Sequence, residues 1–261
     1  MKKLFALLLS VLLIVTCFAG CGPKGKTLAD VKEAGKLVMA TSPDFPPFET
    51  LEGDKVVGIE VELMEIVADK LGVELEIQQI DFDSVLSGIQ AAKFDVGVSG
   101  ITVTEARKKN MLFTDPYYEA AQAIVVKDGS VIASKADLDG KKVSVQSGTT
   151  AEDFCTTNGY TVSSYKANAD AQMALVNDKV DAWVIDNCTA MEMVEKYNAE
   201  NDDKLVILGE SMTTEPYAFA FAFGSEDLVA EVNKVVAELL DDGTVEGIFE
   251  KYETVYEAPQ N

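Results

Sequence analysis

Arg107 stands shortly after a buried apolar run, at a place where its side chain could bind an anion. The run Phe94–Val98 is typical of a buried strand, and Ser99 and Gly100 end it. Ligands bind beside the carboxyl ends of strands in open α/β sheets. A guanidinium at that edge can hold a carboxylate with two parallel hydrogen bonds. Gly100 would give the same ligand access to the backbone.

A helix is expected to carry Arg107. Thr102 and Glu105 have the spacing of a capping box, so we predict that a helix starts at Thr102 or Thr104. Arg107 would lie on the first turns of this helix, and Thr102 would offer a ligand its hydroxyl and a free amide. A helix cap and a surface arginine are the simpler alternative for each residue taken alone.

A second charged group, Asp186, follows the apolar run Trp183-Val184-Ile185. A carboxylate at the end of such a buried strand is costly unless it is paired. A helix is expected after it, so Asp186 could also be the N-cap of that helix. Both roles are compatible, and we favour contact with a ligand.

A third candidate is the helix start that follows Gly148. Thr149 and Glu152 again have capping-box spacing. The unpaired amides at such a start, the hydroxyls of Thr149 and Thr150 and the helix dipole would favour an anion. Capping alone would explain one threonine.

The apolar periodicity predicts an α/β fold of two Rossmann-like units, each with the order β-α-β-α-β. Strands are expected at 37–41, 56–59, 73–80, 94–98, 120–127, 142–146, 161–165, 180–185, 205–208 and 217–223. Helices are expected at 60–71, 85–92, 134–138, 149–157, 169–176, 187–197, 227–240 and 244–252. The chain would cross between the units near 120–125 and 213–218, and two crossings make a double hinge. We therefore predict two lobes, residues 36–120 with 218–261 and residues 121–217.

The candidate residues gather at the ends of predicted strands. These ends are 41–45, 80–83, 99–102, 146–150 and 186. Their shared position predicts a ligand-binding cleft between the lobes.

The composition argues against several functions. The chain of 261 residues is 48% hydrophobic, enough for sizeable cores, and its formal net charge is −22. Such a charge argues against nucleic acid as a partner and against a basic patch for anionic lipid. The sequence has no histidine and no CxxC or HExxH spacing, so we expect no metal site and no cofactor. Cys155 and Cys188 could form a disulfide, and we favour free thiols.

The stretch 99–118, with the pattern S-G-I-T-x-T-x-x-R-K-K…F-T-D-P-Y-Y, resembles the polar amino-acid-binding proteins of ABC importers, solute-binding family 3. The resemblance extends from about Lys36 to about Tyr252. It implies a periplasmic-binding-protein-like fold, also called a Venus flytrap, in which two lobes close around a ligand. No enzyme activity is implied.

The resemblance also implies roles for the candidate residues. Arg107 and the helix start at Thr149 and Thr150 would hold the α-carboxylate of an amino acid. Asp186 would pair with its α-ammonium. The aromatic positions Phe45 and Phe82 would sandwich the ligand side chain, whereas each alone could equally be a core residue.

The side chain of the ligand is less well defined by the sequence. Several members of the family carry an aspartate where this chain has Ser42, and here an aspartate stands two residues later, at Asp44. Ser99 and Gln146 add neutral polar groups. We lean toward arginine or another basic amino acid, then glutamine. Asp44 could instead be a solvated loop residue, and Phe48 fits a core role better than a ligand contact.

The N-terminus predicts export and lipid anchoring. A charged start and the short apolar segment Leu4–Thr16 are typical of a signal peptide. The motif Phe18-Ala19-Gly20-Cys21 resembles a lipobox, which implies a signal peptide over 1–20 and a lipid on Cys21. Residues 21–35 would then form the lipidated cysteine and a tether. Ordinary secretion with cleavage nearby is the alternative.

These features together predict an extracytoplasmic, membrane-anchored, monomeric receptor that captures a free amino acid and delivers it to an ABC permease. Two alternatives remain open. A few dehydratases share the fold, and Asp186 could then act as a general acid. A ligand sensor that signals through a partner is the other alternative.

Overall fold

The computed structural model describes residues 24–259. The predicted signal peptide, 1–20, and the predicted lipidation site, Cys21, lie outside the described residues. Within residues 24–259, no helix is both long and apolar enough to cross a membrane.

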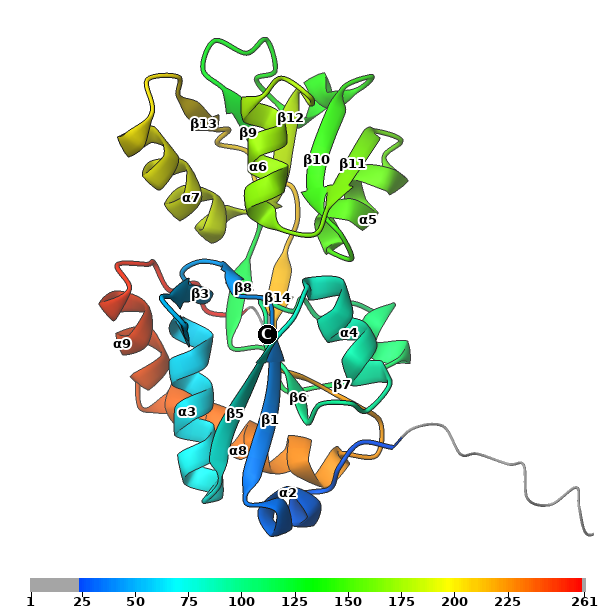
Figure 1. Ribbon diagram of the computed structural model, residues 1–261, viewed down its shortest axis with the longest axis vertical. Coiled ribbons are helices and arrows are strands. Elements are labelled where there is room, and N and C mark those ends of the chain that lie inside the picture. The colour runs from blue at the N-terminus through cyan, green and yellow to red at the C-terminus, as the bar shows by residue number, and fades with distance from the viewer. Residues whose placement is uncertain (1–23, 260–261) are drawn as a thin grey trace, which may run out of the picture.

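Two mixed five-stranded sheets form two lobes, one above the other in Figure 1. The sheet of lobe 1 contains β1 (Lys36–Thr41), β5 (Glu74–Gln79), β6 (Val96–Gly97), β7 (Leu112–Phe113) and β15 (Ala220–Phe221). Its order is β5-β1-β6-β15-β7. β1 pairs in parallel with β5 and β6, and β15 returns antiparallel beside β6. A late part of the chain, β15, therefore lies in the same sheet as the first strand, β1.

Helices flank the sheet of lobe 1. They are α2 (Leu28–Ala34), α3 (Ile59–Leu71), α4 (Phe82–Gln90), α8 (Glu226–Asp241) and α9 (Thr244–Lys251). α3 and α4 lie on opposite sides of the sheet in Figure 1. α3 buries Ile59, Leu63 and Val67, which recur at helical spacing. It ends at Leu71, as predicted, and Gly72 follows with a φ of 76°, which glycine adopts readily.

Lobe 2 repeats the plan. Its strands are β9 (Gln122–Lys127), β10 (Lys142–Gln146), β11 (Thr161–Tyr165), β12 (Ala182–Asp186) and β13 (Leu205–Ile207), in the order β11-β10-β12-β9-β13. Its helices are α5 (Thr150–Thr157), α6 (Asn168–Val176) and α7 (Asn187–Glu200). β10 pairs in parallel with β11 and β12, so the carboxyl ends of these strands point toward lobe 1 (Figure 1).

Two short strands connect the lobes. β8 (Tyr118–Ala120) and β14 (Glu215–Tyr217) pair antiparallel between the two sheets (Figure 1). A small sheet of β2 (Asp44–Phe45), β3 (Glu49–Glu52) and β4 (Lys55–Val57) lies on lobe 1 beside this connection. Short 3-10 turns form at η2 (Arg107–Lys109) and η3 (Lys135–Leu138).

Three expectations about these elements are wrong. No α-helix starts at Thr102 or Thr104, because Thr102 instead forms a β-bridge with Tyr217 and only η2 follows. α4 begins at Phe82 and not at 85, with Asp81 as its N-cap residue. The single strands expected over 120–127 and 217–223 are each two strands in the structure. The first region forms β8 and β9, and the second forms β14 and β15, because each supplies both a strand that connects the lobes and a strand of a sheet.

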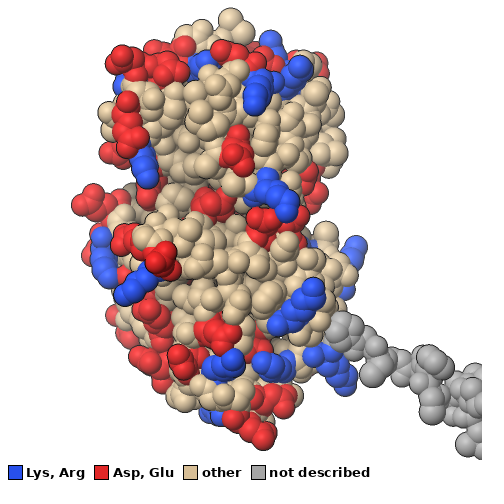
Figure 2. Space-filling view, viewed as in Figure 1, with Lys and Arg blue, Asp and Glu red and all other residues tan. Residues whose placement is uncertain are grey.

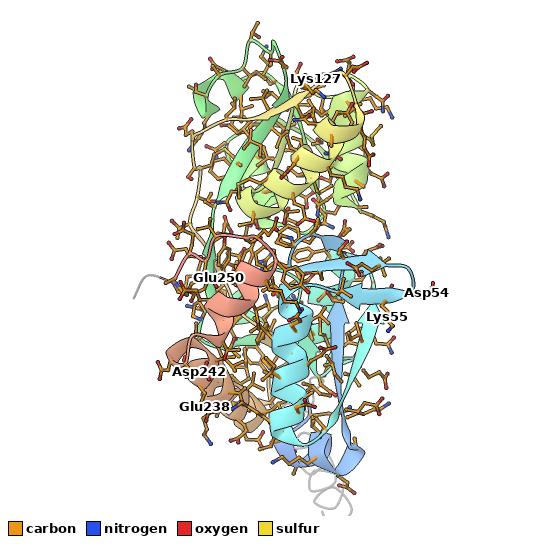
Figure 3. The ribbon with its side chains drawn as sticks, turned by 90° about the vertical axis from the view of Figure 1, so that its left-hand side faces the viewer. Asp54, Lys55, Lys127, Glu238, Asp242 and Glu250 are labelled. Atoms are coloured by element: carbon orange, nitrogen blue, oxygen red, sulfur yellow. The ribbon has the colours of Figure 1, made fainter. Side chains whose placement is uncertain are left out.

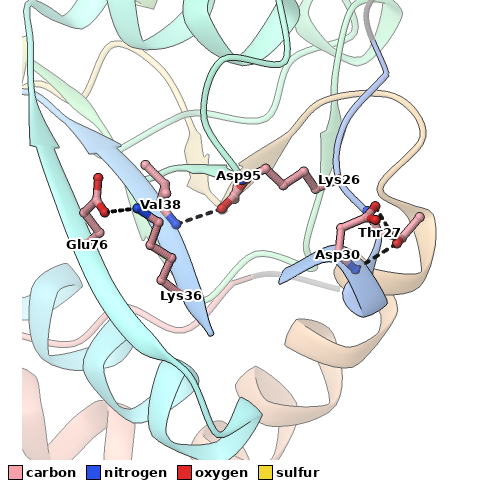
Figure 4. Close-up of polar contacts among 7 residues, drawn as sticks. All are labelled: Lys26, Thr27, Asp30, Lys36, Val38, Glu76 and Asp95. Atoms are coloured by element: carbon pink, nitrogen blue, oxygen red, sulfur yellow. Dashed lines mark hydrogen bonds and ion pairs between the residues drawn. The ribbon is translucent and has the colours of Figure 1, made fainter. Parts of the chain in front are cut away.

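The start of the described chain is tied to the base of lobe 1 (Figure 4). Thr27 caps α2 in a full capping box with Asp30. Lys26 Nζ lies 2.9 Å from Asp95 Oδ1, and the amide of Val38 donates to Asp95 Oδ2 at 2.9 Å. Asp95 is only 2% exposed, so these two contacts pair a buried carboxylate.

Charged side chains cover both lobes. Acidic groups are spread over the whole face shown in Figure 2, with lysines among them. In the side view of Figure 3, Lys127 lies in lobe 2, where its Nζ contacts Asp178 at 2.8 Å. Asp54 and Lys55 mark the turn between β3 and β4, and Glu238 lies on α8 (Figure 3). On this face the acidic groups are thus spread over both lobes and not gathered in one patch.

Candidate ligand-binding site

A cavity lies between the lobes at the carboxyl ends of their central strands. It holds about 420 Å³ of empty space, including the part open to solvent. Its lining is Asp44, Phe45, Phe82, Ser99, Gly100, Thr102, Arg107, Gln146, Thr149, Thr150, Ala151, Asn168, Val184, Ile185 and Asp186. Both lobes contribute, which is the position expected for a ligand in this type of sheet.

Every predicted ligand residue except Ser42 lines this cavity. Ser42 is buried behind Asp44, and its hydroxyl donates to Asp44 Oδ1 at 2.9 Å. Four further residues line the cavity although none was selected from the sequence: Ala151, Asn168, Val184 and Ile185. Which of the lining residues contact a ligand remains a prediction.

Arg107 reaches the cavity from η2 without the predicted helix. Its guanidinium donates to the carbonyl oxygens of Thr102, at 2.9 Å, and of Gly148 across the cleft, at 3.1 Å. It also lies over the ring of Phe82, 5.7 Å from the centroid. Burial lowers the pKa of Arg107, and the negative charge of Glu215 is the largest opposing influence. A guanidinium stays charged in proteins, so this one can still accept a carboxylate partner.

Asp186 ends β12 and stands at the N-cap position of α7, but its side chain makes no capping bond. The hydroxyl of Tyr217, from the connecting strand β14, donates to it instead. Burial, followed by the charge of Glu215, raises the pKa of Asp186 to about 7. Asp186 therefore occupies the N-cap position, but its side chain does not cap the helix. A cationic partner would stabilise the charged form.

Glu215 is a carboxylate near this site that sequence reasoning missed. It is 3% exposed, and within the described chain its Oε2 has no hydrogen-bond partner. Residues 215 and 217 share a face of β14 because strand side chains alternate. Tyr217 points from that face to Asp186. The spacing of Glu215 and Tyr217 places both side chains on one face only in a strand, and no strand was predicted over 215–217.

The start of α5 forms another wall. Thr149 caps the helix by accepting from the amide of Glu152 at 3.2 Å. The carboxylate of Glu152 accepts from the amide of Gly148 at 2.7 Å, so the predicted helix start is right but the capping box is incomplete. Thr150 Oγ accepts from the buried amide side chain of Gln122 at 2.9 Å.

Asp44 joins the two lobes. Its Oδ2 accepts from the backbone amide of Asn168 at 2.7 Å, at the first turn of α6. Gln146 Nε2 approaches both carboxylate oxygens at longer distances, 3.3 and 3.2 Å. Burial raises the pKa of Asp44, and the bond from Asn168 opposes that shift most. Asp44 is thus a half-buried residue of the cavity and not a solvated loop residue.

The aromatic residues separate into two groups. Phe45 and Phe82 are both buried and line the cavity, so each belongs to the hydrophobic core and to the cavity wall. Phe48 is fully buried and stacks on Phe45 with ring centroids 5.7 Å apart, which confirms its predicted core role. A Cβ on Gly100 would lie 2.5 Å from the Phe45 ring, so only glycine fits against it.

Neither a disulfide nor a metal cluster forms part of the described structure. Cys155 and Cys188 are free and buried, as favoured from the sequence. Residues 24–259 contain no group of three or more His, Cys, Asp or Glu side chains arranged to hold a metal ion.

Comparison with known proteins identifies the class. Residues 37–255 match the bacterial extracellular solute-binding proteins, family 3, and the chain belongs to this family. It is 34% identical over 259 residues to the arginine-binding extracellular protein ArtP of Bacillus subtilis (strain 168), covering 97% of this chain and 99% of that relative.

Solved structures give the same result for the fold. Holo ArgBP from T. maritima matches with a TM-score of 0.77 at 36% identity, over 87% of this chain and 99% of that one. An ancestral arginine-binding protein bound to glutamine matches with a TM-score of 0.78 at 40% identity, over 84% and 97% of the chains. The predicted two-lobed fold is confirmed, and these relatives are named for binding, which agrees with the expectation that the chain is not an enzyme.

Proposed function

We propose that this protein is the extracytoplasmic receptor of an ABC importer, which captures a polar amino acid between its lobes and delivers it to the permease. The observation that carries the proposal is that Arg107 and Asp186 line one cavity from opposite lobes. An α-carboxylate suits the guanidinium, and an α-ammonium suits the carboxylate. Every amino acid carries both groups on one carbon, so this pair would bind the part that all of them share.

Arginine is the ligand that we favour, followed by other basic amino acids and then glutamine. Asp44 offers a carboxylate to a cationic tip, and its long bonds from Gln146 could give way to that tip. Phe45 and Phe82 supply flat faces for an aliphatic stem or a guanidinium. Relatives that are named for arginine support the first choice, and an ancestral arginine-binding protein bound to glutamine supports glutamine as a further candidate. Aspartate and glutamate would place a second carboxylate near Asp44 and should bind poorly.

Closure of the lobes would accompany binding. We assign lobe 1 to residues 36–120 and 218–261 and lobe 2 to residues 121–217, with the hinge at the paired strands β8 and β14. Two connecting strands permit a rotation of the lobes about their pairing. A lipid on Cys21 would hold this monomer at the outer face of the membrane, a role supported by the motif alone.

Calorimetry with ligand-free protein tests the proposal. The protein is unfolded, dialysed, refolded and titrated with each of the twenty amino acids. We expect L-arginine to bind most tightly, with L-glutamine weaker and L-glutamate without measurable heat. Absence of binding by all twenty would overturn the receptor proposal. Tight binding of an apolar amino acid with no response to arginine, lysine or ornithine would overturn only the basic preference.

A further inference from the structure

Two buried glutamates lie behind the lobe 1 wall of the cavity. Glu49 on β3 and Glu60 on α3 both have no exposed surface, and their carboxyl groups hydrogen-bond to each other. Two carboxyl groups in contact inside a protein do not both ionise, because the second charge would be repelled and poorly solvated. The pair therefore holds one shared proton.

The surrounding donors indicate which glutamate carries that proton. Glu60 accepts from the amide of Gly100 at 2.9 Å and from the hydroxyl of Tyr117, as a carboxylate does. Glu49 Oε1 accepts from the hydroxyl of Ser99 at 2.7 Å. Glu49 Oε2 receives no hydrogen bond from any donor of the described residues. One of the two carboxyl groups must donate to the other, and the acceptor bonds of Glu60 are already in use, so we place the shared proton on Glu49.

Glu49 and Glu60 accept hydrogen bonds from two residues of the cavity wall. Ser99 and Gly100, the residues that they hold, both line the cavity. Ser99 Oγ also accepts from the amide of Ser42 at 3.1 Å, which links the wall to the end of β1. Gly100 adopts a φ of 53° against the ring of Phe45. A shift of this backbone would move the wall that faces the ligand.

We propose that Glu49 and Glu60 act as one proton-sharing unit of positioning residues, which holds Ser99 and Gly100 in the conformation that the ligand meets. The inference rests on the proposed function, since it concerns the same cavity. Glu49 supplies a donor and an acceptor, and Glu60 supplies acceptors only. The two glutamates therefore differ in which substitutions they tolerate.

Ionisation of the shared proton should weaken the site at alkaline pH. Burial, then the charge of Glu60, raises the pKa of Glu49 well above 4.5. The other titratable groups that face the pair are Asp44 and Tyr117, and each is neutral or negative, so neither favours loss of the proton. A raised folded-state pKa gives a stabilisation that is complete below the unfolded-state pKa and is lost as the pH rises through the folded-state pKa.

The test compares alanine and glutamine at each position. Glu49→Ala and Glu60→Ala should each weaken L-arginine binding by about tenfold or more, because buried donors lose their acceptors. Glu49→Gln keeps one acceptor and one donor and should restore affinity to within about threefold of the unmodified protein. Glu60→Gln puts an amide donor opposite a donor and should not restore it. Glu65→Gln, on an exposed position of α3, is the matched control.

The pH profile gives a readout that a purely structural role would not move. Equilibrium unfolding and L-arginine titration are measured from about pH 5 to about pH 9. The unmodified protein should lose stability as the pH rises, and Glu49→Gln should lose less because its donor cannot ionise. The affinity of Glu49→Gln relative to that of the unmodified protein at the same pH should therefore increase as the pH rises. Equal effects of glutamine at both positions, or an unchanged alkaline loss in Glu49→Gln, would overturn the inference.

The two proposals fail separately. If the unmodified protein binds no amino acid, the proposed function fails, and the positioning role fails with it, whereas the unfolding profiles still show whether the proton is shared. If it binds L-arginine and the glutamine variants behave alike, only the inference about the pair fails. Should Glu60→Gln not fold, the comparison of Glu49→Gln with Glu49→Ala decides the outcome.

Discussion

At the scale of single residues, Arg107 provides the most direct test of the site. Its guanidinium already bonds to two carbonyl oxygens, which fixes its plane beside the cavity. We expect Arg107→Ala to cost several kcal/mol of binding, on the order of a broken buried charge pair. Arg107→Lys should also bind poorly, because an ammonium cannot reproduce the planar fork. Calorimetry with L-arginine measures both, and Lys108→Ala on the exposed neighbour is the control. Near-native affinity in Arg107→Ala would remove the carboxylate assignment.

Ionisation of Asp186 as the pH rises should increase the affinity for an amino acid and lower the stability of the ligand-free fold. Its pKa of about 7 means that acid removes the charge that would pair with an α-ammonium, so affinity should fall as the pH drops below about 7. The same raised pKa stabilises the ligand-free fold most below 3.8, and this contribution is lost as the pH rises through about 7. Titrations from about pH 5.5 to about pH 8 should show a dependence that Asp186→Asn abolishes and Asp170→Asn leaves intact. A flat profile in the unmodified protein would contradict the assignment.

Asp44 should discriminate between ligands of different charge. Asp44→Asn removes a charge-assisted hydrogen bond to a cationic side chain, which is worth roughly 1.5–3 kcal/mol. L-glutamine has no charge to lose and should weaken less. Competition of the two amino acids for each variant measures the ratio, with Asp54→Asn in the exposed β3–β4 turn as control (Figure 3). An equal loss for both ligands would place the cationic tip elsewhere.

At the scale of elements, Asp95 links the N-terminal segment to β1 (Figure 4). We expect Asp95→Ala to lower the free energy of unfolding by about 1–3 kcal/mol, because it leaves the amide of Val38 without its acceptor. Lys26→Ala should cost less, about 1 kcal/mol at most, since its side chain is half-exposed. Urea unfolding measures both variants against Lys36→Ala, which removes an exposed pair. Equal losses for Asp95→Ala and Lys36→Ala would show that burial adds nothing here.

The elements also show what sequence could and could not predict. The strands at 142–146 and 161–165 were predicted with their observed bounds, because local apolar patterning and flanking turns define both. The helix expected from Thr102 was wrong because Thr102 pairs with Tyr217, a partner far along the chain. Arg107 and Asp186, the charged residues selected because they follow predicted strands, both line the cavity. Glu215 was missed because its burial depends on how the lobes pack, which no local pattern encodes.

At the scale of the whole molecule, the predicted anchor can be tested without reference to the ligand. The motif ending in Cys21 predicts a lipid on that thiol. Cys21→Ala should move the protein from the membrane fraction to the soluble extracytoplasmic fraction. Cys17→Ala, four residues earlier, should leave it in the membrane. Mass spectrometry of the native protein that finds no lipid at Cys21 would refute the prediction.

Several bonds join the lobes directly. Asp44 accepts from Asn168, Arg107 donates to Gly148, and Lys166 Nζ lies 2.5 Å from Asp81 Oδ2. Each such bond lowers the free energy of an empty closed protein as well as that of a loaded one. A transporter that recognises only the closed conformation would therefore also bind a fraction of the receptors that carry no ligand. Variants that strengthen these bonds should bind the ligand more tightly, but they should also be closed more often without it. High affinity and a large difference in conformation between ligand-free and ligand-bound protein therefore oppose each other in this architecture.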